Sequence, residues 1–207
     1  MAKGVSRRNA LSSVLAFGGI TGLLGVQARG EVRRLLPADR IRPPGALRES
    51  GFLEACVRCG LCVQACPYDT LNLADLGASV PAGTPYFVAR QTACEMCITI
   101  PCVAACPTGA LRSSLTDITD AAMGLAELSA PGRCLSTTGA AYCDSCFQAC
   151  PVKGLALRMQ PGHTARGGNF TPFVDAGYCT GCGCCEAACV LQGNAAITVR
   201  ANHVAQR

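Results

Sequence analysis

Cysteine is the residue type that stands out in this chain, because seventeen of its 207 residues are cysteines. Sixteen of them form four groups of four, and in every group the fourth cysteine follows the third after three intervening residues. The first three groups end in a Cys-Pro pair, and one cysteine, Cys184, falls outside the pattern. The groups are Cys56, Cys59, Cys62 and Cys66; Cys94, Cys97, Cys102 and Cys106; Cys134, Cys143, Cys146 and Cys150; and Cys179, Cys182, Cys185 and Cys189.

The first group has the spacing C-x2-C-x2-C-x3-C-P, which is typical of bacterial ferredoxins. In such a run three thiolates on one tight loop bind a [4Fe–4S] cluster, and the fourth cysteine ligates a different cluster. The proline fixes φ and has no N–H group, so the chain turns sharply after the fourth ligand. Four complete groups therefore predict four [4Fe–4S] clusters with sixteen cysteine ligands, and they leave Cys184 as a non-ligand.

Three other uses of cysteine fit this pattern poorly. Disulfides need an even number of cysteines and give no reason to repeat the whole four-cysteine run. Zinc ribbons use paired C-x2-C knuckles, and not a third cysteine two residues further on that is followed by a fourth. Covalent haem needs C-x-x-C-H, and neither His163 nor His203 follows such a pair, so we expect both to be surface residues. A disulfide-stapled exported binding protein is the distant alternative.

The rest of the composition offers little material for an ordinary apolar core. The chain has six Phe, four Tyr and no Trp. Because metal-site formation contributes folding free energy directly, we expect clusters to replace the missing core and the iron-free chain to be largely unfolded. Each oxidised cluster with four thiolates adds a charge of about −2, so the formal +5 of the chain says little about partners. No aromatic-plus-basic pattern indicates nucleic-acid binding.

The N-terminus is typical of a twin-arginine export signal. Arg7 and Arg8 precede an uncharged run that reaches Ala28, and Val26-Gln27-Ala28 has the small residues that signal peptidase needs. We expect cleavage after Ala28 and a mature chain in the periplasm without a transmembrane span. This route exports folded proteins, which favours metal over disulfides. An uncleaved anchor is the alternative, although the apolar run of about 17 residues is short against the roughly 20 that span a bilayer.

Short elements must position the cysteines. Each group is followed by a short apolar segment that predicts a strand, at 71–73, 110–111, 155–157 and 197–199. A packing helix is predicted over 117–128, with Thr116 or Asp117 as its N-cap. We therefore predict an α+β, ferredoxin-like fold whose four motifs form two dicluster units. The predicted organisation is a signal peptide (1–28), an extended basic lead-in (29–48), the four-cluster domain (49–200) and a tail (201–207).

The chain resembles the NapG/MauM family of ferredoxin-type proteins over about 42–199. The long spacing of the third group and the twin-arginine signal agree with this family. The resemblance is carried by RPPGA at 42–46, CVRCG at 56–60, CPYDTL at 66–71, GTPYFVAR at 83–90, CEMC at 94–97, IPC at 100–102, MGLA at 123–126 and CTGCG at 179–183.

The resemblance implies an electron-transfer role, and the chain contains no Ser-His-Asp set, phosphate loop or carboxylate cluster that would indicate catalysis. It implies a membrane-bound, quinol-oxidising NapH-type partner. Electrons would pass from quinol through the clusters to a multihaem cytochrome and on to periplasmic nitrate reductase. Methylamine oxidation or another molybdoenzyme is the alternative destination. The sixteen cysteines match the ligand positions of the family, and Cys184 departs from it.

The family is similar to iron–sulfur subunits of molybdenum enzymes, in which the first group pairs with the fourth and the second with the third. Pairing of neighbouring groups is the alternative, and the two differ in whether Cys66 lies near Cys182 or near Cys97. The favoured pattern gives four ligand sets: Cys56, Cys59, Cys62 with Cys189; Cys179, Cys182, Cys185 with Cys66; Cys94, Cys97, Cys102 with Cys150; and Cys134, Cys143, Cys146 with Cys106.

Overall fold

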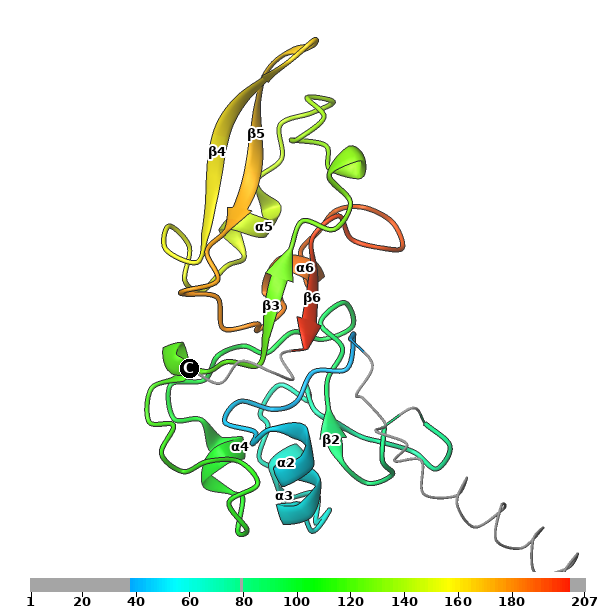
Figure 1. The fold of residues 1–207 in the computed structure, drawn as a ribbon, viewed down its shortest axis with the longest axis vertical. Helices are drawn as coiled ribbons and strands as arrows, with labels where there is room; N and C mark the ends of the chain where they lie inside the picture. The colour runs from blue at the N-terminus through cyan, green and yellow to red at the C-terminus, as the bar shows by residue number, and fades with distance from the viewer. Residues whose placement is uncertain (1–37, 79, 202–207) are drawn as a thin grey trace, which may run out of the picture. The chain divides into compact units, whose positions relative to one another are not determined.

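The computed structural model describes residues 38–78 and 80–201. The predicted signal peptide, residues 29–37 of the lead-in and residues 202–207 of the tail, with His203, lie outside these residues. None of the helices described is long and apolar enough to cross a membrane. The elements are α2 (Glu49–Ala55), α3 (Leu61–Gln64), β1 (Asn72–Leu73), β2 (Pro85–Tyr86), α4 (Pro101–Ala104), η1 (Ile118–Asp120), β3 (Gly124–Glu127), η2 (Pro131–Arg133), α5 (Ser145–Gln148), β4 (Leu157–Thr164), β5 (Gly167–Val174), α6 (Cys184–Ala187) and β6 (Thr198–Ala201) (Figure 1).

Within the described residues the strands form antiparallel pairs: β1 with β2, β3 with β6, and β4 with β5. The β4–β5 hairpin is the longest pair, and its register joins Leu157 to Val174 at the base. The β3–β6 pair joins the segment between the second and third groups to the end of the described chain (Figure 1). Short helices and short strands thus make up the fold, as the sequence predicts.

The predicted strands are confirmed to different degrees. Segment 71–73 contains β1, and 197–199 overlaps β6. Segment 155–157 contributes only Leu157, where β4 begins. Segment 110–111 forms only a single bridge between Leu111 and Ala46.

Four one-turn helices repeat one local arrangement. Each helix ends at an alanine C-cap that directly precedes the fourth cysteine of its group. The start of α6 requires glycine, since Gly183 has a φ of 89° and a Cβ there would lie 2.5 Å from the Cβ of Ala89. The third cysteines lie on these helices: Cys62 on α3, Cys102 on α4, Cys146 on α5 and Cys185 on α6.

The helix predicted over 117–128 is wrong. Asp117 is an N-cap, as predicted, and its carboxylate accepts a hydrogen bond from the N–H of Thr119 at 2.8 Å. The helix is nevertheless a single 3-10 turn, η1, after which the chain becomes β3. The backbone groups of residues 123–127 form hydrogen bonds with distant segments and not with a helix, because Met123 donates to the carbonyl of Thr180 at 2.9 Å and β3 pairs with β6. Tertiary pairing overrides the local apolar periodicity.

The interior of the described chain combines a few large side chains with cysteines. One apolar cluster contains the buried Cys102, Cys182 and Cys185 together with the largest buried residues. The cysteines therefore form part of the core, as the poor supply of aromatic residues leads us to expect. The largest fully buried apolar side chains are Phe52, Phe87, Ile41, Leu111 and Ile197.

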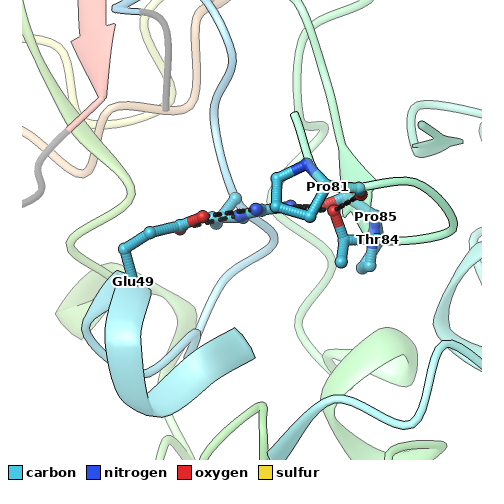
Figure 2. A network of polar contacts seen from close by, with 5 residues as sticks. Glu49, Pro81, Thr84 and Pro85 are labelled. Atoms are coloured by element: carbon cyan, nitrogen blue, oxygen red, sulfur yellow. Dashed lines mark hydrogen bonds and ion pairs between the residues drawn. The ribbon is translucent and has the colours of Figure 1, made fainter. Parts of the chain in front are cut away.

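The described part of the lead-in is built into the fold through Arg42. Its guanidinium is buried and donates to both carboxylate oxygens of Glu49, at 2.6 and 3.0 Å (Figure 2). It also donates to the hydroxyl of Thr84 at 3.0 Å and to the carbonyl of Pro85 at 2.7 Å. Its carbon Cζ lies 4.6 Å from the centroid of the Phe52 ring. Such a bidentate, charge-assisted ion pair fixes the relative orientation of the two side chains. Here the contacts of Arg42 connect the lead-in to α2 and β2, beside the first cysteine group.

Candidate iron–sulfur centres

A cavity in the described chain is lined by cysteines of both the first and the second groups. The second group contributes its first three cysteines, Cys94, Cys97 and Cys102, and the first group contributes Cys66. Pro67, which turns the chain directly after Cys66, also lines it. Four thiols from two segments thus face one space, which is the donor set that a [4Fe–4S] cluster requires.

Two further cavities repeat this arrangement with the third and fourth groups. Each combines the first three cysteines of one group with the last cysteine of the other. The first of these cavities is lined by Cys179, Cys182, Cys185 and Cys150. The other is lined by Cys134, Cys143, Cys146 and Cys189.

The remaining four cysteines complete the pattern. Cys62 on α3 interacts electrostatically with Cys56, Cys59 and Cys106. The Cys106 sulfur accepts a hydrogen bond from the N–H of Leu111 at 3.5 Å. All sixteen cysteines predicted as ligands are therefore distributed over four sets of four, and Cys184 lines none of the three cavities.

The favoured pairing of the first group with the fourth and of the second with the third is wrong. Cys66 lies with Cys97, whose pKa is raised first by burial and then by the Cys66 charge. The physical reason is the packing of the one-turn helices, since α3 contacts α4 and α5 contacts α6. The fourth cysteine after each helix therefore reaches the site of the helix beside it. The regularity of the spacing within a group says nothing about this pairing.

The two pairs of sites meet through the second and fourth groups. The backbone N–H of Cys94 donates to the carbonyl of Cys182 at 2.8 Å, and these residues line adjacent cavities. Cys102 interacts with Cys62 on one side, and Cys185 interacts with Cys146 on the other. The spatial order of the sites is thus first, second, fourth and third, so that the first and third groups lie at the ends.

Burial disfavours the charged form of these thiols while no cation is bound. Desolvation, followed by the charges of neighbouring cysteines, raises the pKa of Cys62 and of Cys146 to about 11. Desolvation also raises the pKa of Cys94 to about 11 and that of Cys102 to about 12. Thiolates are the ligand form of cysteine. A strongly positive group such as iron would favour the thiolate form of these four cysteines.

Cys182 differs from these ligands because several donors surround its sulfur. The side chain and the backbone N–H of Cys184, followed by the side chain of Thr180, lower the pKa of Cys182 to about 6. The proximity of Cys182 raises the pKa of Cys184. The Cys184 thiol donates to the carbonyl of Cys94 at 3.5 Å, and the Thr180 hydroxyl donates to the sulfur of Met96 at 3.1 Å. The seventeenth cysteine is therefore a neighbour of two predicted ligands.

Arg90 supports the loop of the third site, and no local sequence signal identifies it. Its guanidinium donates to the backbone carbonyls of Glu186 at 2.8 Å, Cys189 at 2.9 Å and Gly193 at 3.1 Å. These acceptors lie about a hundred residues further along the chain, and in the sequence Arg90 stands out only as the last residue of the resembling segment GTPYFVAR. It fixes the backbone around Cys189.

The cysteine sets are arranged around cavities and not around the position of a single metal ion. Among the residues described, no three His, Cys, Asp or Glu side chains come close enough to hold one metal ion. Each of three cysteine sets instead lines a cavity. Four cysteine thiols around one cavity are the soft donor set that iron–sulfur clusters use.

Comparison with known proteins agrees with this geometry. Residues 55–110 match the family of 4Fe-4S dicluster domains, and this range contains the whole of the first and second groups as one unit. The ferredoxin-type protein NapG of Escherichia coli is 47% identical over 191 residues, which are 90% of this chain and 82% of that protein. The methylamine utilization ferredoxin-type protein MauM of Methylorubrum extorquens is 46% identical over 200 residues, 95% of this chain and 90% of that protein. No solved structure matches.

Cysteine sets of this composition and a dicluster domain define an iron–sulfur electron-transfer protein, which binds 4Fe-4S clusters and is not an enzyme. The chain belongs to the family of the NapG and MauM ferredoxin-type proteins. The resemblance seen in the sequence is thereby confirmed.

Proposed function

We propose that the protein holds four [4Fe–4S] clusters on its sixteen grouped cysteines and passes single electrons along them in the order first, second, fourth and third. The observation that carries this proposal is the sharing of cysteines between neighbouring groups, together with the contact between Cys94 and Cys182. Cys184 is not a ligand in this arrangement. A relay needs close spacing between sites and needs no substrate pocket.

The residues of the chain hold and adjust these sites. Each cluster, when bound, supplies one-electron redox chemistry. The protein supplies the thiolates, an apolar surrounding that excludes water, and hydrogen bonds to the sulfurs. The bond from the N–H of Leu111 to the Cys106 sulfur is of this kind.

The two ends of this relay carry exposed apolar side chains, which suit transient docking of redox partners. At the first group Val57 is 63% exposed, and Cys59 is exposed beside it. At the third site Val190 is 53% exposed next to Cys189, and Tyr142 packs edge-on against Phe170 with ring centroids 6.3 Å apart.

The proposed location is the periplasm, reached by the twin-arginine route after the clusters are inserted. The proposed donor is a membrane-bound, quinol-oxidising NapH-type protein, and the proposed acceptor is a multihaem cytochrome or periplasmic nitrate reductase. The support is the family relationship to NapG and the export signal. A second candidate is the same relay in methylamine oxidation. Two MauM proteins, 46% and 45% identical, favour it as strongly.

Iron and sulfide analysis of the anaerobically purified protein tests the cluster content. We expect about 16 iron and about 16 sulfide per chain and a brown protein that absorbs broadly in the visible range. A colourless protein without free thiols would contradict the proposal and favour the disulfide-stapled alternative.

Matched variants at the two ends test the relay. Val57→Asp and Val190→Asp both place a charge on an exposed valine beside a predicted ligand. We expect both variants to keep the full iron content. One of the two variants should slow reduction of the protein by quinol-loaded membranes, and the other should slow electron transfer from the protein to the acceptor. Full rates for both variants in both steps would show that electrons do not enter and leave at these ends.

A further inference from the structure

Two large apolar side chains at the second site are exposed to solvent. Tyr68 lines the cavity that contains Cys66 and Cys97, and it is nevertheless 55% exposed. Ile98 directly follows Cys97 in the chain and is 88% exposed. An electron at the second site is therefore separated from solvent by a single side chain, although this site is not at an end of the proposed relay.

The exposure of Ile98 follows from the loop that carries it. The second group has four residues between its second and third cysteines, whereas the other groups have two. Within this longer loop Ile100 has a φ of 43° and a ψ of 58°, a left-handed conformation that β-branched residues rarely adopt. Ile100 is buried and lines the cavity, while Ile98 remains in solvent. Strained residues of this kind cluster at functional sites.

The charged residues that line this cavity, or adjoin its lining residues in the sequence, are all acidic. Glu95 lines the cavity, Asp69 follows Tyr68, and Asp117 precedes Ile118, which is also part of the lining. All three carboxylates are exposed, and none of them belongs to an ion pair within the described chain. Together with the two apolar side chains they form what we call the second-site face: Tyr68, Asp69, Glu95, Ile98 and Asp117.

The other two cavities of the described chain lack this uniform charge. Residues that adjoin their linings in the sequence carry both signs, and the basic ones are Arg133, Lys153, Arg158 and Arg200. A bound, oxidised cluster with four thiolates adds a charge of about −2 to the second site. A surface of one sign attracts a partner of the opposite sign and accelerates its association. The second-site face is therefore complementary to a positively charged protein.

We infer that the second-site face is a docking surface for a basic one-electron carrier protein, in addition to the two ends of the relay. Tyr68 and Ile98 provide the apolar contact that excludes water between the partners, and the three carboxylates attract the basic residues of the carrier. This inference rests on the proposed function, because an electron must be available at the second site.

Stopped-flow oxidation of the reduced, cluster-loaded protein by ferric cytochrome c, a basic haem protein, tests the charge complementarity. One electron passes to the haem iron, which becomes ferrous, and no atom is transferred. We expect the rate constant to fall by about tenfold or more between ionic strengths of about 0.01 M and about 0.15 M, because salt shortens the screening length. The double variant Asp69→Asn/Glu95→Gln should react about three- to tenfold more slowly than wild type at the low ionic strength and close to wild type at the high one.

Two further variants separate this face from general effects. Glu54→Gln/Asp75→Asn removes the same charge from two exposed acids that neither line the cavity nor adjoin a lining residue. This matched control should react within about twofold of wild type at both ionic strengths. Ile98→Ser should slow the reaction at both ionic strengths, because salt does not screen an apolar contact.

Carbodiimide cross-linking identifies the contact, since it joins carboxylates directly to lysines that touch them. Mass spectrometry should find lysines of cytochrome c joined to Asp69 or Glu95, and the Asp69→Asn/Glu95→Gln variant should lose these links.

Each other outcome overturns the inference. Equal slowing by the control double variant would show that net charge acts and not this face, and a rate independent of ionic strength would refute the charge complementarity. Cross-links between two copies of this chain, in place of links to cytochrome c, would make the face a self-association surface. A wild-type protein without iron would overturn the proposed function as well, whereas these other failures in a fully loaded protein overturn this inference alone.

Discussion

A cluster that has lost one cysteine ligand is no longer intact, so removing a second ligand of the same cluster should not reduce the number of intact clusters further. Cys66 and Cys97 line the same cavity, whereas Cys182 lines another. In the double variant Cys66→Ala/Cys97→Ala we therefore expect one cluster to be lost, which leaves about 12 of about 16 iron in intact four-iron clusters. In Cys66→Ala/Cys182→Ala two clusters lose a ligand, and about 8 iron should remain in intact clusters.

Mössbauer spectroscopy of iron-57-labelled protein measures this fraction, since it separates intact four-iron clusters from partly dismantled ones. Cys184→Ala is the matched control, because it removes a cysteine of the same region and should leave all clusters intact. Pairing of the first group with the fourth predicts the reverse order of the two double variants. The reasoning is refuted if Cys66→Ala/Cys182→Ala keeps more intact clusters than Cys66→Ala/Cys97→Ala.

Three further predictions concern stability. The Gly181→Ala variant should release its clusters faster in guanidinium than the Gly193→Ala variant. Both glycines have a left-handed backbone, which costs alanine about 1–2 kcal/mol of stability at either position. Only at Gly181 would the added Cβ overlap the backbone of β3, which costs about 1–3 kcal/mol more. Glu49→Gln should lower the free energy of unfolding by about 3–5 kcal/mol, because it leaves the buried Arg42 charge without its partner, and the loss is measured by denaturant titration. Chelator-driven loss of clusters should accelerate as the pH falls from about 8 to about 6. Thiols such as Cys102, with a pKa of about 12 when no cluster is bound, must lose protons to bind iron, so protons compete with iron throughout this range. Equal rates for the two glycine variants, an unchanged stability of Glu49→Gln, or slower loss at low pH would contradict the respective prediction.

The chemistry of the cysteines could be predicted from the sequence because it depends on local spacing. The third thiol of each group and the fourth, one helical turn later, are set by the short chain between them, and the repeated one-turn helices reproduce this four times. The pairing of the groups could not be predicted, since it depends on which helices pack together. Here the resemblance to more distant iron–sulfur subunits was misleading.

The same distinction explains the remaining failures. Residues 117–128 have the apolar period of a helix, yet the backbone of β3 is paired with β6, more than seventy residues away. Arg42 and Arg90 are single basic residues in the sequence, and their roles appear only when partners such as Glu49 and the carbonyl of Cys189 are placed beside them. Interactions within one turn were predictable, and interactions between distant segments were not.

The β4–β5 hairpin explains why the third and fourth groups share their cysteines. Leu157 pairs with Val174, so the chain leaves the third group and returns to nearly the same point before the fourth group begins. Both residues line the cavity that contains Cys150 and Cys179, while Pro172 on β5 lines the neighbouring cavity of the third group. A hairpin with this register brings two consecutive groups together whatever its length.

A connection that crossed the molecule would instead separate the third and fourth groups. The fourth group, returned by the hairpin, then meets the second through Cys94 and Cys182, which places the last group of the sequence in the middle of the proposed relay. The order of the cysteine groups along the chain therefore differs from the spatial order of the sites, along which we propose that electrons pass. In the proposed relay, substitutions near Cys179, Cys182 and Cys185 should therefore act on the step between the two pairs of sites, whereas those at the first and third sites, the latter including Cys189, should act on exchange with partners.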